Sequence, residues 1–252
     1  MNNEIKTTKK KNKLTRRILL FIVPFTVFSI GSIPFLVIIR MTLYIYNIWR
    51  FHHILFDILI LPFLFILGLL ILIISETFAS GLFIKVFNIR YNEGVYEYST
   101  SDSNSFRWMI TCQLYTPIRK ILEIIPLPGI KYLHLKMLGM HIGENTLIGG
   151  VIKDPCVTEI GKNTTIGEYA ILYAHMHDYS KQILTVQKIK IGDNCIIGAG
   201  AIIMPGVTME DNSIVGAGAV VPKNHVLKTG KMYIGNPLEE REQKMDKKTR
   251  LE

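Results

Sequence analysis

The C-terminal half of this 252-residue chain carries a repeat with a period of six residues. An aliphatic residue followed by glycine recurs at this spacing, and a small or β-branched residue stands four positions later. This period is neither that of an α-helix nor the simple alternation of a strand. Each hexad offers one large and one small inward position, so stacked turns predict a narrow coil with a continuous core. The aliphatic-glycine pairs are Ile142-Gly143, Ile148-Gly149, Ile160-Gly161, Ile166-Gly167, Ile191-Gly192, Ile197-Gly198 and Val215-Gly216.

The phase of this repeat is interrupted once. Residues 172 and 191 are 19 positions apart, which is three hexads plus one. Part of the intervening chain must therefore leave the coil, and we expect an extruded loop over residues 177–190, directly after the sequence LYAHMH. Loops that project from a rigid scaffold are favoured places for functional residues.

The N-terminal third is strongly apolar. Residues 18–39 and residues 58–75 contain no charged side chain, and about 20 apolar residues are enough to cross the hydrocarbon layer of a membrane. Charged residues make up 19% of the whole chain, against about 25% in typical soluble domains. We therefore expect a transmembrane hairpin over residues 18–80, with spans at about 18–39 and 54–75.

Positive charge is concentrated beside the first apolar run. The formal net charge is +9, and residues 1–17 hold seven Lys or Arg against one acid. Basic residues next to a membrane span mark the cytoplasmic side and anionic lipid more often than nucleic acid. Two spans then predict a multi-pass cell-membrane protein whose termini and remaining chain are cytosolic, with no nucleic-acid partner. Arg40 and Arg50, in the expected connecting loop, are outnumbered by the N-terminal cluster.

Residues 81–130 join the apolar hairpin to the repeat. The sequence FIKVFNIRYNEGVYEY alternates around Asn92-Glu93-Gly94, which predicts two short strands joined by a turn. A polar linker, 99–105, follows, and apolar residues at helical spacing over 106–125 indicate an amphipathic helix. That helix is expected either on the membrane surface or packed on the soluble domain. The repeat domain is expected over 131–237, with a polar tail over 238–252.

The stretch IKIGDNCIIGAGAIIMPGVTMEDNSIVGAGAVVPKNHV, followed by Gly235-Asn236-Pro237, resembles the hexapeptide-repeat acyltransferases. This resemblance implies a left-handed parallel β-helix, so the expected fold class is mainly β, preceded by the transmembrane hairpin and the amphipathic segment. The sequences RYNEGVYEY and LGMHIGENTLIGGVIKDPCVTEIG are similar to membrane-associated transferase modules at the C-terminal end of poly-lysine synthetases. The family often continues Gly-Asn-Pro-Ala-Lys, whereas this chain continues with Leu238-Glu239.

Acyl transfer of this class needs a base that accepts a proton from an attacking hydroxyl or amine. Histidine suits this task because its ordinary pKa of about 6.5 lies near the working pH. The resemblance implies a catalytic histidine just before the extruded loop and ahead of an aspartate, which His175 and His177 both satisfy. His177 fits the spacing better and is preferred, with Asp178 expected to orient the imidazole. We interpret three others as structural: His134, His141 and His225.

The resemblance also implies acetyl-CoA, or another acyl-CoA, as co-substrate, with no permanently bound cofactor and no metal. The turns Gly198-Ala199 and Gly216-Ala217 would contact the pantetheine arm, and Lys223 would meet the phosphates. Lys228 and Lys231 are weaker additions. The same glycines would also occur in a β-helix that binds nothing, because coil corners need permissive backbone. A homotrimer is implied as well.

The expected function is acetyl transfer to a hydroxyl or amine of a membrane-associated acceptor, such as a lipid-linked glycan, a lipid head group or a nascent polymer. Three alternatives stay open at this stage. The first is an amide-forming transferase that uses a carrier-tethered thioester. The second is a β-helical carbonic anhydrase with zinc on His175 and His177, although no third histidine lies about one coil away. The third is a non-enzymatic, membrane-tethered scaffold.

Overall fold

The computed structural model describes residues 2–49, 58 and 60–242. The chain forms two compact units. The helical unit comprises residues up to Arg90 together with Ser105–Leu138, and the β-helix unit comprises Tyr91–Asn104 together with the chain from Gly139 onward. The structure is 44% helical, so the expectation of a mainly β protein is too narrow: a substantial helical unit precedes the coil.

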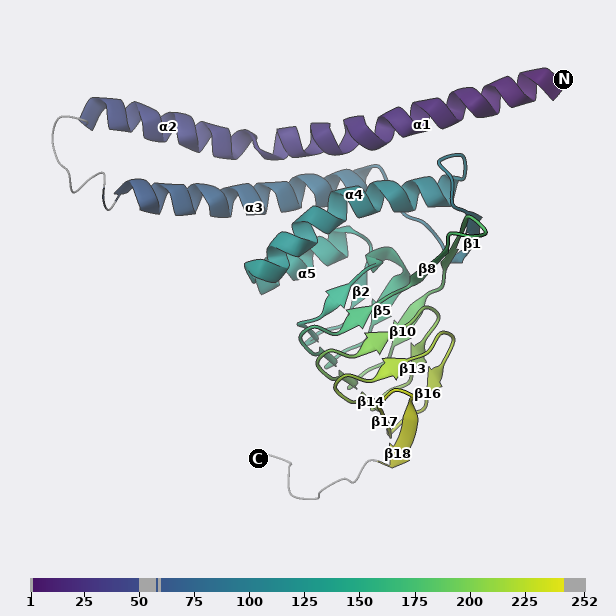
Figure 1. Ribbon diagram of the computed structural model, residues 1–252. Coiled ribbons are helices and arrows are strands. Elements are labelled where there is room, and N and C mark those ends of the chain that lie inside the picture. The colour runs from purple at the N-terminus through teal and green to yellow at the C-terminus, as the bar shows by residue number, and fades with distance from the viewer. Residues whose placement is uncertain (1, 50–57, 59, 243–252) are drawn as a thin grey trace. The chain divides into compact units, whose positions relative to one another are not determined.

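The β-helix unit winds through three parallel sheets of short strands (Figure 1). The first sheet contains β2 (His141–Ile142), β5 (Thr158–Ile160), β10 (Ile189–Ile191), β13 (Thr208–Met209) and β16 (Val226–Leu227). The second contains β3 (Leu147–Ile148), β6 (Thr165–Ile166), β11 (Ile196–Ile197), β14 (Ile214–Val215) and β17 (Lys231–Ile234). The third contains β4 (Val151–Ile152), β7 (Ile171–Leu172), β12 (Ile202–Ile203) and β15 (Val220–Val221). The parallel coils fit the left-handed β-helix expected from the hexad repeat.

Strand register confirms the six-residue repeat and its interruption. Ile191 pairs with Met209, 18 residues further along, whereas Ile160 pairs with Ile191, 31 residues further along. Inward aliphatic residues such as Ile160 are fully buried, and so are the small residues Ala201 and Ala219. The coil therefore turns once in three hexads, and the extra residues of the longer step leave it between β7 and β10.

The corners between the first and second sheets are made by asparagines. Asn145, Asn163 and Asn194 all have a positive φ, between 51° and 56°. Their side-chain amides form a ladder, in which Asn145 donates to Asn163 over 3.4 Å and Asn163 donates to Asn194 over 3.2 Å. Asparagine tolerates this left-handed conformation better than other residues with a side chain, apart from aspartate. The corners thus combine the required turn with contacts between successive coils.

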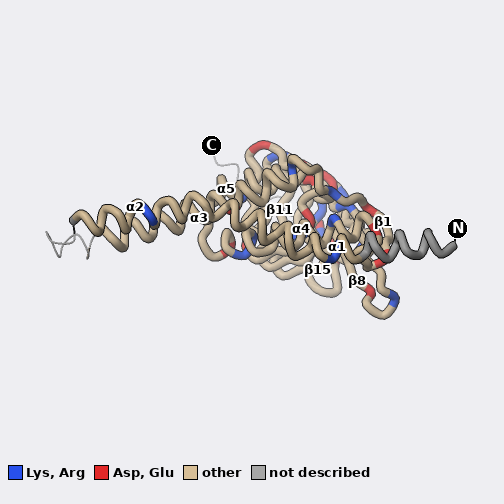
Figure 2. The backbone as a smooth tube through the Cα atoms, turned by 90° about the horizontal axis from the view of Figure 1, so that it is seen from above, with Lys and Arg blue, Asp and Glu red and all other residues tan. Residues whose placement is uncertain are grey.

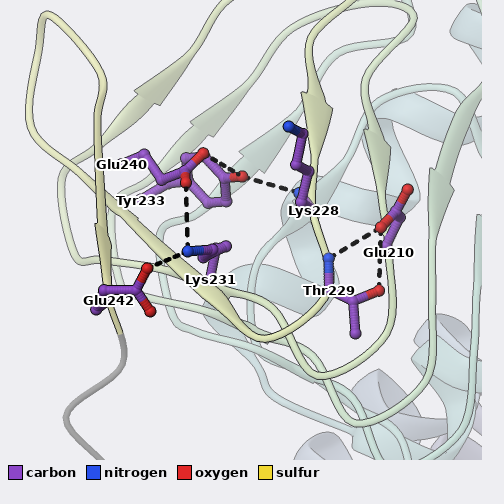
Figure 3. A network of polar contacts seen from close by, with 7 residues as sticks. All are labelled: Glu210, Lys228, Thr229, Lys231, Tyr233, Glu240 and Glu242. Carbon is purple, nitrogen blue, oxygen red and sulfur yellow. Dashed lines mark hydrogen bonds and ion pairs between the residues drawn. The ribbon is translucent and has the colours of Figure 1, made fainter.

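The C-terminal end of the coil is closed by β18 (Glu239–Glu242), which pairs antiparallel with β17 (Figure 3). Lys231 forms ion pairs with Glu240 and Glu242. The Tyr233 hydroxyl donates to Glu240 over 3.1 Å and accepts the backbone N–H of Lys228 over 2.8 Å. The first residues of the expected polar tail are therefore a strand, while residues 243–252 lie outside the described chain.

The extruded segment is a hairpin rather than an irregular loop. Strand β8 (His175–Asp178) pairs antiparallel with β9 (Ile183–Val186), and β9 pairs antiparallel with β1 (Gly94–Glu97). The expected pair of strands around Asn92-Glu93-Gly94 is wrong, because its first half continues a helix through Val86 and only the second half forms a strand. Alternation of polar and apolar residues in that first half was outweighed by continuation of a long apolar helix.

The helical unit contains α1 (Asn2–Gly31), α2 (Ile33–Trp49), α3 (Leu61–Val86), α4 (Ser103–Ile124) and α5 (Pro128–Met137). By length and composition alone, the segments Leu14–Gly31 and Leu61–Val86 could cross a membrane, and Ile33–Ile48 is apolar but shorter. Figure 2 shows that α2 and α3 carry little charge. Between Ile60 and Ile84 the charged residue is Glu76, which accepts a hydrogen bond from Ser32 over 2.8 Å.

Several expected boundaries differ in this unit. The basic arm is continuous with α1, the expected span 18–39 is divided between α1 and α2, and the expected connecting loop is helical through Trp49. The start of the second expected span lies outside the described residues. The amphipathic helix is present as α4, with Ile118 and Leu122 packed on Ile73 of α3. The coil begins at His141 rather than at residue 131, because α5 occupies Pro128–Met137.

We predict that Asn163→Ala lowers the free energy of unfolding by about 1–2 kcal/mol, since alanine is strained in a left-handed conformation. Asn163→Gly is the matched variant: it loses the same amide contacts but adopts this φ without strain. Thermal unfolding followed by circular dichroism should therefore rank the proteins as wild type, Asn163→Gly, then Asn163→Ala. Equal losses for the two variants would show that the amide ladder, and not the corner conformation, dominates.

Candidate active site

The candidate site lies at the corner where the chain passes from the third sheet to the first. Asp154 occupies this corner between β4 and β5, and the hairpin that carries His175 leaves the same corner between β7 and β10. In successive coils the corner is formed by Pro205-Gly206 and by Pro222-Lys223-Asn224. Stacking of the coils thus brings Asp154 beside a segment that begins about one turn later in the sequence.

Asp154 is fully buried and accepts three hydrogen bonds. Its Oδ1 accepts the Tyr91 hydroxyl over 2.8 Å. Its Oδ2 accepts the backbone N–H of Ala174 over 3.0 Å and lies 2.7 Å from Nδ1 of His175. A buried carboxylate is costly unless it is hydrogen-bonded, so these donors account for its presence at this corner.

This pairing determines which nitrogen of His175 is available for chemistry. When Nδ1 carries the proton that is donated to Asp154, Nε2 of the neutral ring has a lone pair. A carboxylate placed behind the imidazole also stabilises the imidazolium that forms when Nε2 accepts a proton. The side chain of His175 is 16% exposed, so the ring is held in place but is still reachable. The arrangement therefore suits a general base.

His177 lies next to His175 in an aromatic environment. Its ring is stacked on Tyr179 at 5.2 Å between centroids and meets Tyr98 edge-on at 4.8 Å. The His175 and His177 rings are 5.3 Å apart. Burial, and secondly the neighbouring His175, lowers the pKa of His177, so it is neutral at physiological pH. Both expected histidines are thus brought together on one strand.

Asp178 is placed differently from the expectation. Its carboxylate accepts the Ser180 hydroxyl over 2.6 Å and the backbone N–H of Lys181 over 3.1 Å, and these bonds lower the pKa of Asp178. It therefore stabilises the turn between β8 and β9. The carboxylate bonded to an imidazole is Asp154, which the sequence interpretation missed.

A signal for Asp154 was present in the hexad phase. Counting from Ile142 and Ile148, the next aliphatic position is residue 154, where the chain has an aspartate. In the structure Ile152 takes the inward position of this strand, and Asp154 is displaced to the corner. A charged residue at a core position of a repeat indicates either a break in the coil or a functional carboxylate, and here it marks both.

The residues expected to bind coenzyme A fall at two different corners. The Gly198-Ala199 and Gly216-Ala217 turns stack on each other between the second and third sheets, so closely that a Cβ on Gly198 would lie 2.4 Å from the backbone nitrogen of Ala217. Lys223 lies instead at the corner of Asp154, and its side chain is exposed. Lys231, a weaker candidate, is engaged by Glu240 and Glu242 at the end of the coil.

The histidines interpreted as structural lie elsewhere. His134 is buried in α5, where its Nε2 is 3.2 Å from the Ser80 hydroxyl and burial lowers its pKa to about 4. His141 is exposed on the first sheet, and His225 packs edge-on against Tyr233 at 6.3 Å. Among the described residues, no group of three or more His, Cys, Asp or Glu side chains is placed to hold a metal ion.

We predict that Asp154→Ala lowers the free energy of unfolding by about 2–4 kcal/mol, because two buried donors lose their acceptor. Asp154→Asn should cost less: its amide oxygen can still accept from Ala174 and His175, while its NH2 donates to a reoriented Tyr91 hydroxyl. Urea unfolding of both variants measures the difference. Equal stability of Asp154→Ala and wild type would contradict the hydrogen-bonded arrangement described above.

Comparison with known sequences places the repeat in a described family. The family described as "Bacterial transferase hexapeptide (six repeats)" matches residues 188–223. A Dictyostelium discoideum protein provisionally named an acetyltransferase is 32% identical over 120 residues, which cover 45% of this chain and 61% of that protein. The chain thus spans less than two thirds of that relative's length. A Bacillus subtilis protein, also provisionally named an acetyltransferase, is 31% identical over 127 residues, covering 47% of this chain and 70% of that protein.

Solved structures show weaker likeness. A maltose O-acetyltransferase from Clostridium difficile has 26% identity and a TM-score of 0.42, covering 50% of this chain and 84% of that one. A hexapeptide-repeat acetyltransferase from Vibrio cholerae, complexed with acetyl coenzyme A, has 22% identity and a TM-score of 0.43, covering 50% of this chain and 85% of that one. The repeat match and the extent of the Bacillus match show that this chain belongs to the hexapeptide-repeat acyltransferase family.

Proposed function

We propose that this protein transfers an acetyl group from acetyl-CoA to a hydroxyl or amine of a membrane-associated acceptor. The observation that carries this proposal is the 2.7 Å contact between the buried Asp154 and Nδ1 of His175, at the corner where the hairpin leaves the coil. Such a pair provides a base whose orientation is fixed by the scaffold. Membership of an acyltransferase family supports the reaction class.

In this mechanism His175 is the base, and this revises the earlier preference for His177. Nε2 of His175 accepts the proton of the acceptor hydroxyl or amine as its oxygen or nitrogen attacks the thioester carbonyl. The tetrahedral intermediate then collapses, the carbon–sulfur bond breaks, and the coenzyme A thiolate takes the proton from the imidazolium. The products are the acetylated acceptor and free coenzyme A. His177, which is neutral and lies 5.3 Å away between ring centroids, lines the same site.

The donor would lie along the third sheet, which is flanked by the two corners that hold the expected contacts. Lys223 is an exposed cation at the corner of the histidines, which suits a phosphate group. The stacked turns at Gly198-Ala199 and Gly216-Ala217 lie at the opposite edge of that sheet and expose backbone. A donor that reaches both corners would use the width of one sheet.

Outward-facing side chains support a homotrimer. The second sheet exposes Leu147 and Ile196, at 61% and 46% of their surfaces. The third sheet presents a column of aliphatic residues on its outer face: Val151, Ile171, Ile202 and Val220. The first sheet presents polar residues, including Glu159 and Lys190. Two apolar faces and one polar face fit a closed ring of three copies, which sedimentation in detergent would test.

The decisive experiment compares His175→Ala with His177→Ala, using acetyl-CoA as donor and octyl glucoside or octylamine as acceptor. We expect His175→Ala to reduce turnover by 10² to 10⁴-fold, which is the usual contribution of a general base. His177→Ala should retain more activity, and Asp178→Asn should stay near wild type because its carboxylate contacts the turn. Thiol release and mass spectrometry of the acceptor measure the rates. Full activity of His175→Ala would overturn the assignment.

We propose further that the helical unit anchors the protein in the cell membrane, with both termini and the β-helix unit on the cytosolic side. The support is the apolar exterior of its helices, in which Phe21, Phe25 and Phe63 are 80%, 75% and 63% exposed. In water such large exposed side chains are unfavourable, whereas lipid accommodates them. A C-terminal reporter that is active only in the cytosol should give a signal. A signal from a reporter active only outside the cytosol would contradict this topology.

A further inference from the structure

The segment between α3 and α4 contributes to the β-helix unit although helices precede and follow it. Tyr91–Asn104 belongs to the compact unit of the coil, and its strand β1 extends the hairpin sheet by pairing with β9. Tyr91 and Tyr98 stand at the two ends of this strand segment. The first is bonded to Asp154, and the second meets the His177 ring edge-on. A segment from outside the repeat therefore reaches both histidines of the site.

Tyr91 is held firmly in this position. It is 2% exposed, its hydroxyl donates to Oδ1 of Asp154 over 2.8 Å, and its carbonyl accepts the Cys156 thiol over 3.7 Å. Burial raises the pKa of this thiol to about 11, so it stays neutral. The hydroxyl of Tyr91 and Nδ1 of His175 thus contact different oxygens of one buried carboxylate.

We propose that Tyr91 is a positioning residue that sets the basicity of His175 through Asp154. This inference rests on the proposed role of His175 as the base. Two donors that share a carboxylate compete for its negative charge. The hydroxyl of Tyr91 draws charge toward Oδ1 and so weakens the stabilisation of a protonated His175 at Oδ2. A segment that lies outside the coils thereby adjusts the pH at which the base is available.

The charged and titratable groups around His175 come from several elements. His177 lies beside it on β8, and Cys156 follows Asp154 at the same corner. Tyr173 meets the His175 ring at 6.4 Å between centroids, and the Lys153 ammonium lies over the Tyr173 ring at 5.6 Å. Tyr91→Phe leaves all these groups in place and removes one donor from Asp154. Its effect on the titration of His175 therefore reports on that hydrogen bond.

The test is a pH titration of the full-length protein in detergent, followed by NMR of ring-labelled histidine. The His175 signal is identified by its loss in His175→Gln. We expect Tyr91→Phe to raise the titration midpoint of His175 by about half to one pH unit, since one hydrogen bond to the charged acceptor is lost. Tyr96→Phe is the matched control, because its hydroxyl bonds to the backbone carbonyls of Asn92 and Glu93 in the same segment. It should leave the midpoint unchanged.

Kinetics provide the second measurement. In acetyl transfer to octyl glucoside, the acid limb of kcat/KM for Tyr91→Phe should move to higher pH by the same amount. The loss of activity should therefore be several-fold at pH 6 and small at pH 8.5, with KM for acetyl-CoA unchanged. In an Asp154→Asn background, Tyr91→Phe should have no further effect on the pH profile.

The outcomes separate the inference from the function on which it rests. An unchanged His175 midpoint in Tyr91→Phe would overturn the role of Tyr91, whatever the activity. A loss of activity that is equal at every pH would also overturn it, because that result indicates a purely structural contact. A shifted midpoint with full activity of His175→Ala would instead retain the coupling and refute His175 as the base.

Discussion

Stacking of inward side chains in register is the constraint on which the β-helix unit depends. Each coil places an aliphatic residue directly above its counterpart 18 residues earlier, as in the pairing of Ile191 with Met209. Any residue beyond this count has no place in the core and must leave at a corner. The chain can therefore carry an insertion without disturbing its neighbours, provided that it returns in phase, as it does at Ile189. The hairpin and the coil are consequences of one counting rule.

The same rule explains why a buried carboxylate is tolerated beside the hairpin. Inside a coil, an aspartate would have only apolar neighbours, and its desolvation would be costly. At the corner, Asp154 meets the backbone N–H of Ala174, where the chain begins to leave the coil, and a tyrosine from outside the repeat. Departure from regular structure supplies the donors that regular structure lacks. Function and irregularity therefore coincide at this corner for a physical reason.

Much of the coil could be predicted from the sequence, because hexad phase is a local property. The repeat, the place of the interruption and the proximity of His175 to His177 all follow from spacing. The partner of His175 could not be found by the same means, since contact between Asp154 and His175 depends on the stacking of successive coils. Nearness in sequence instead favoured Asp178, which hydrogen-bonds within its own turn.

Errors in the helical unit have a different origin. Hydropathy identifies apolar segments but does not locate helix ends, so the break between Gly31 and Ile33 and the continuation of α2 to Trp49 were not predicted. The alternation around residues 83–90 resembled a strand because a long helix, apolar on most sides, also places polar residues at short intervals near its end. Lys85 and Asn88 are such residues. Tertiary packing outweighed the local pattern there.

The strand that closes the coil has a consequence for solubility. A stack of parallel coils ends in an unpaired strand edge, and such an edge can add further strands from another copy without limit. Here β18 covers β17, and its sequence Glu-Glu-Arg-Glu exposes three acidic side chains at this end of the coil. A second copy that approached end to end would bring carboxylates against carboxylates. The acidic strand thus acts as a terminator of polymer growth, and it confines self-association to the faces of the coil.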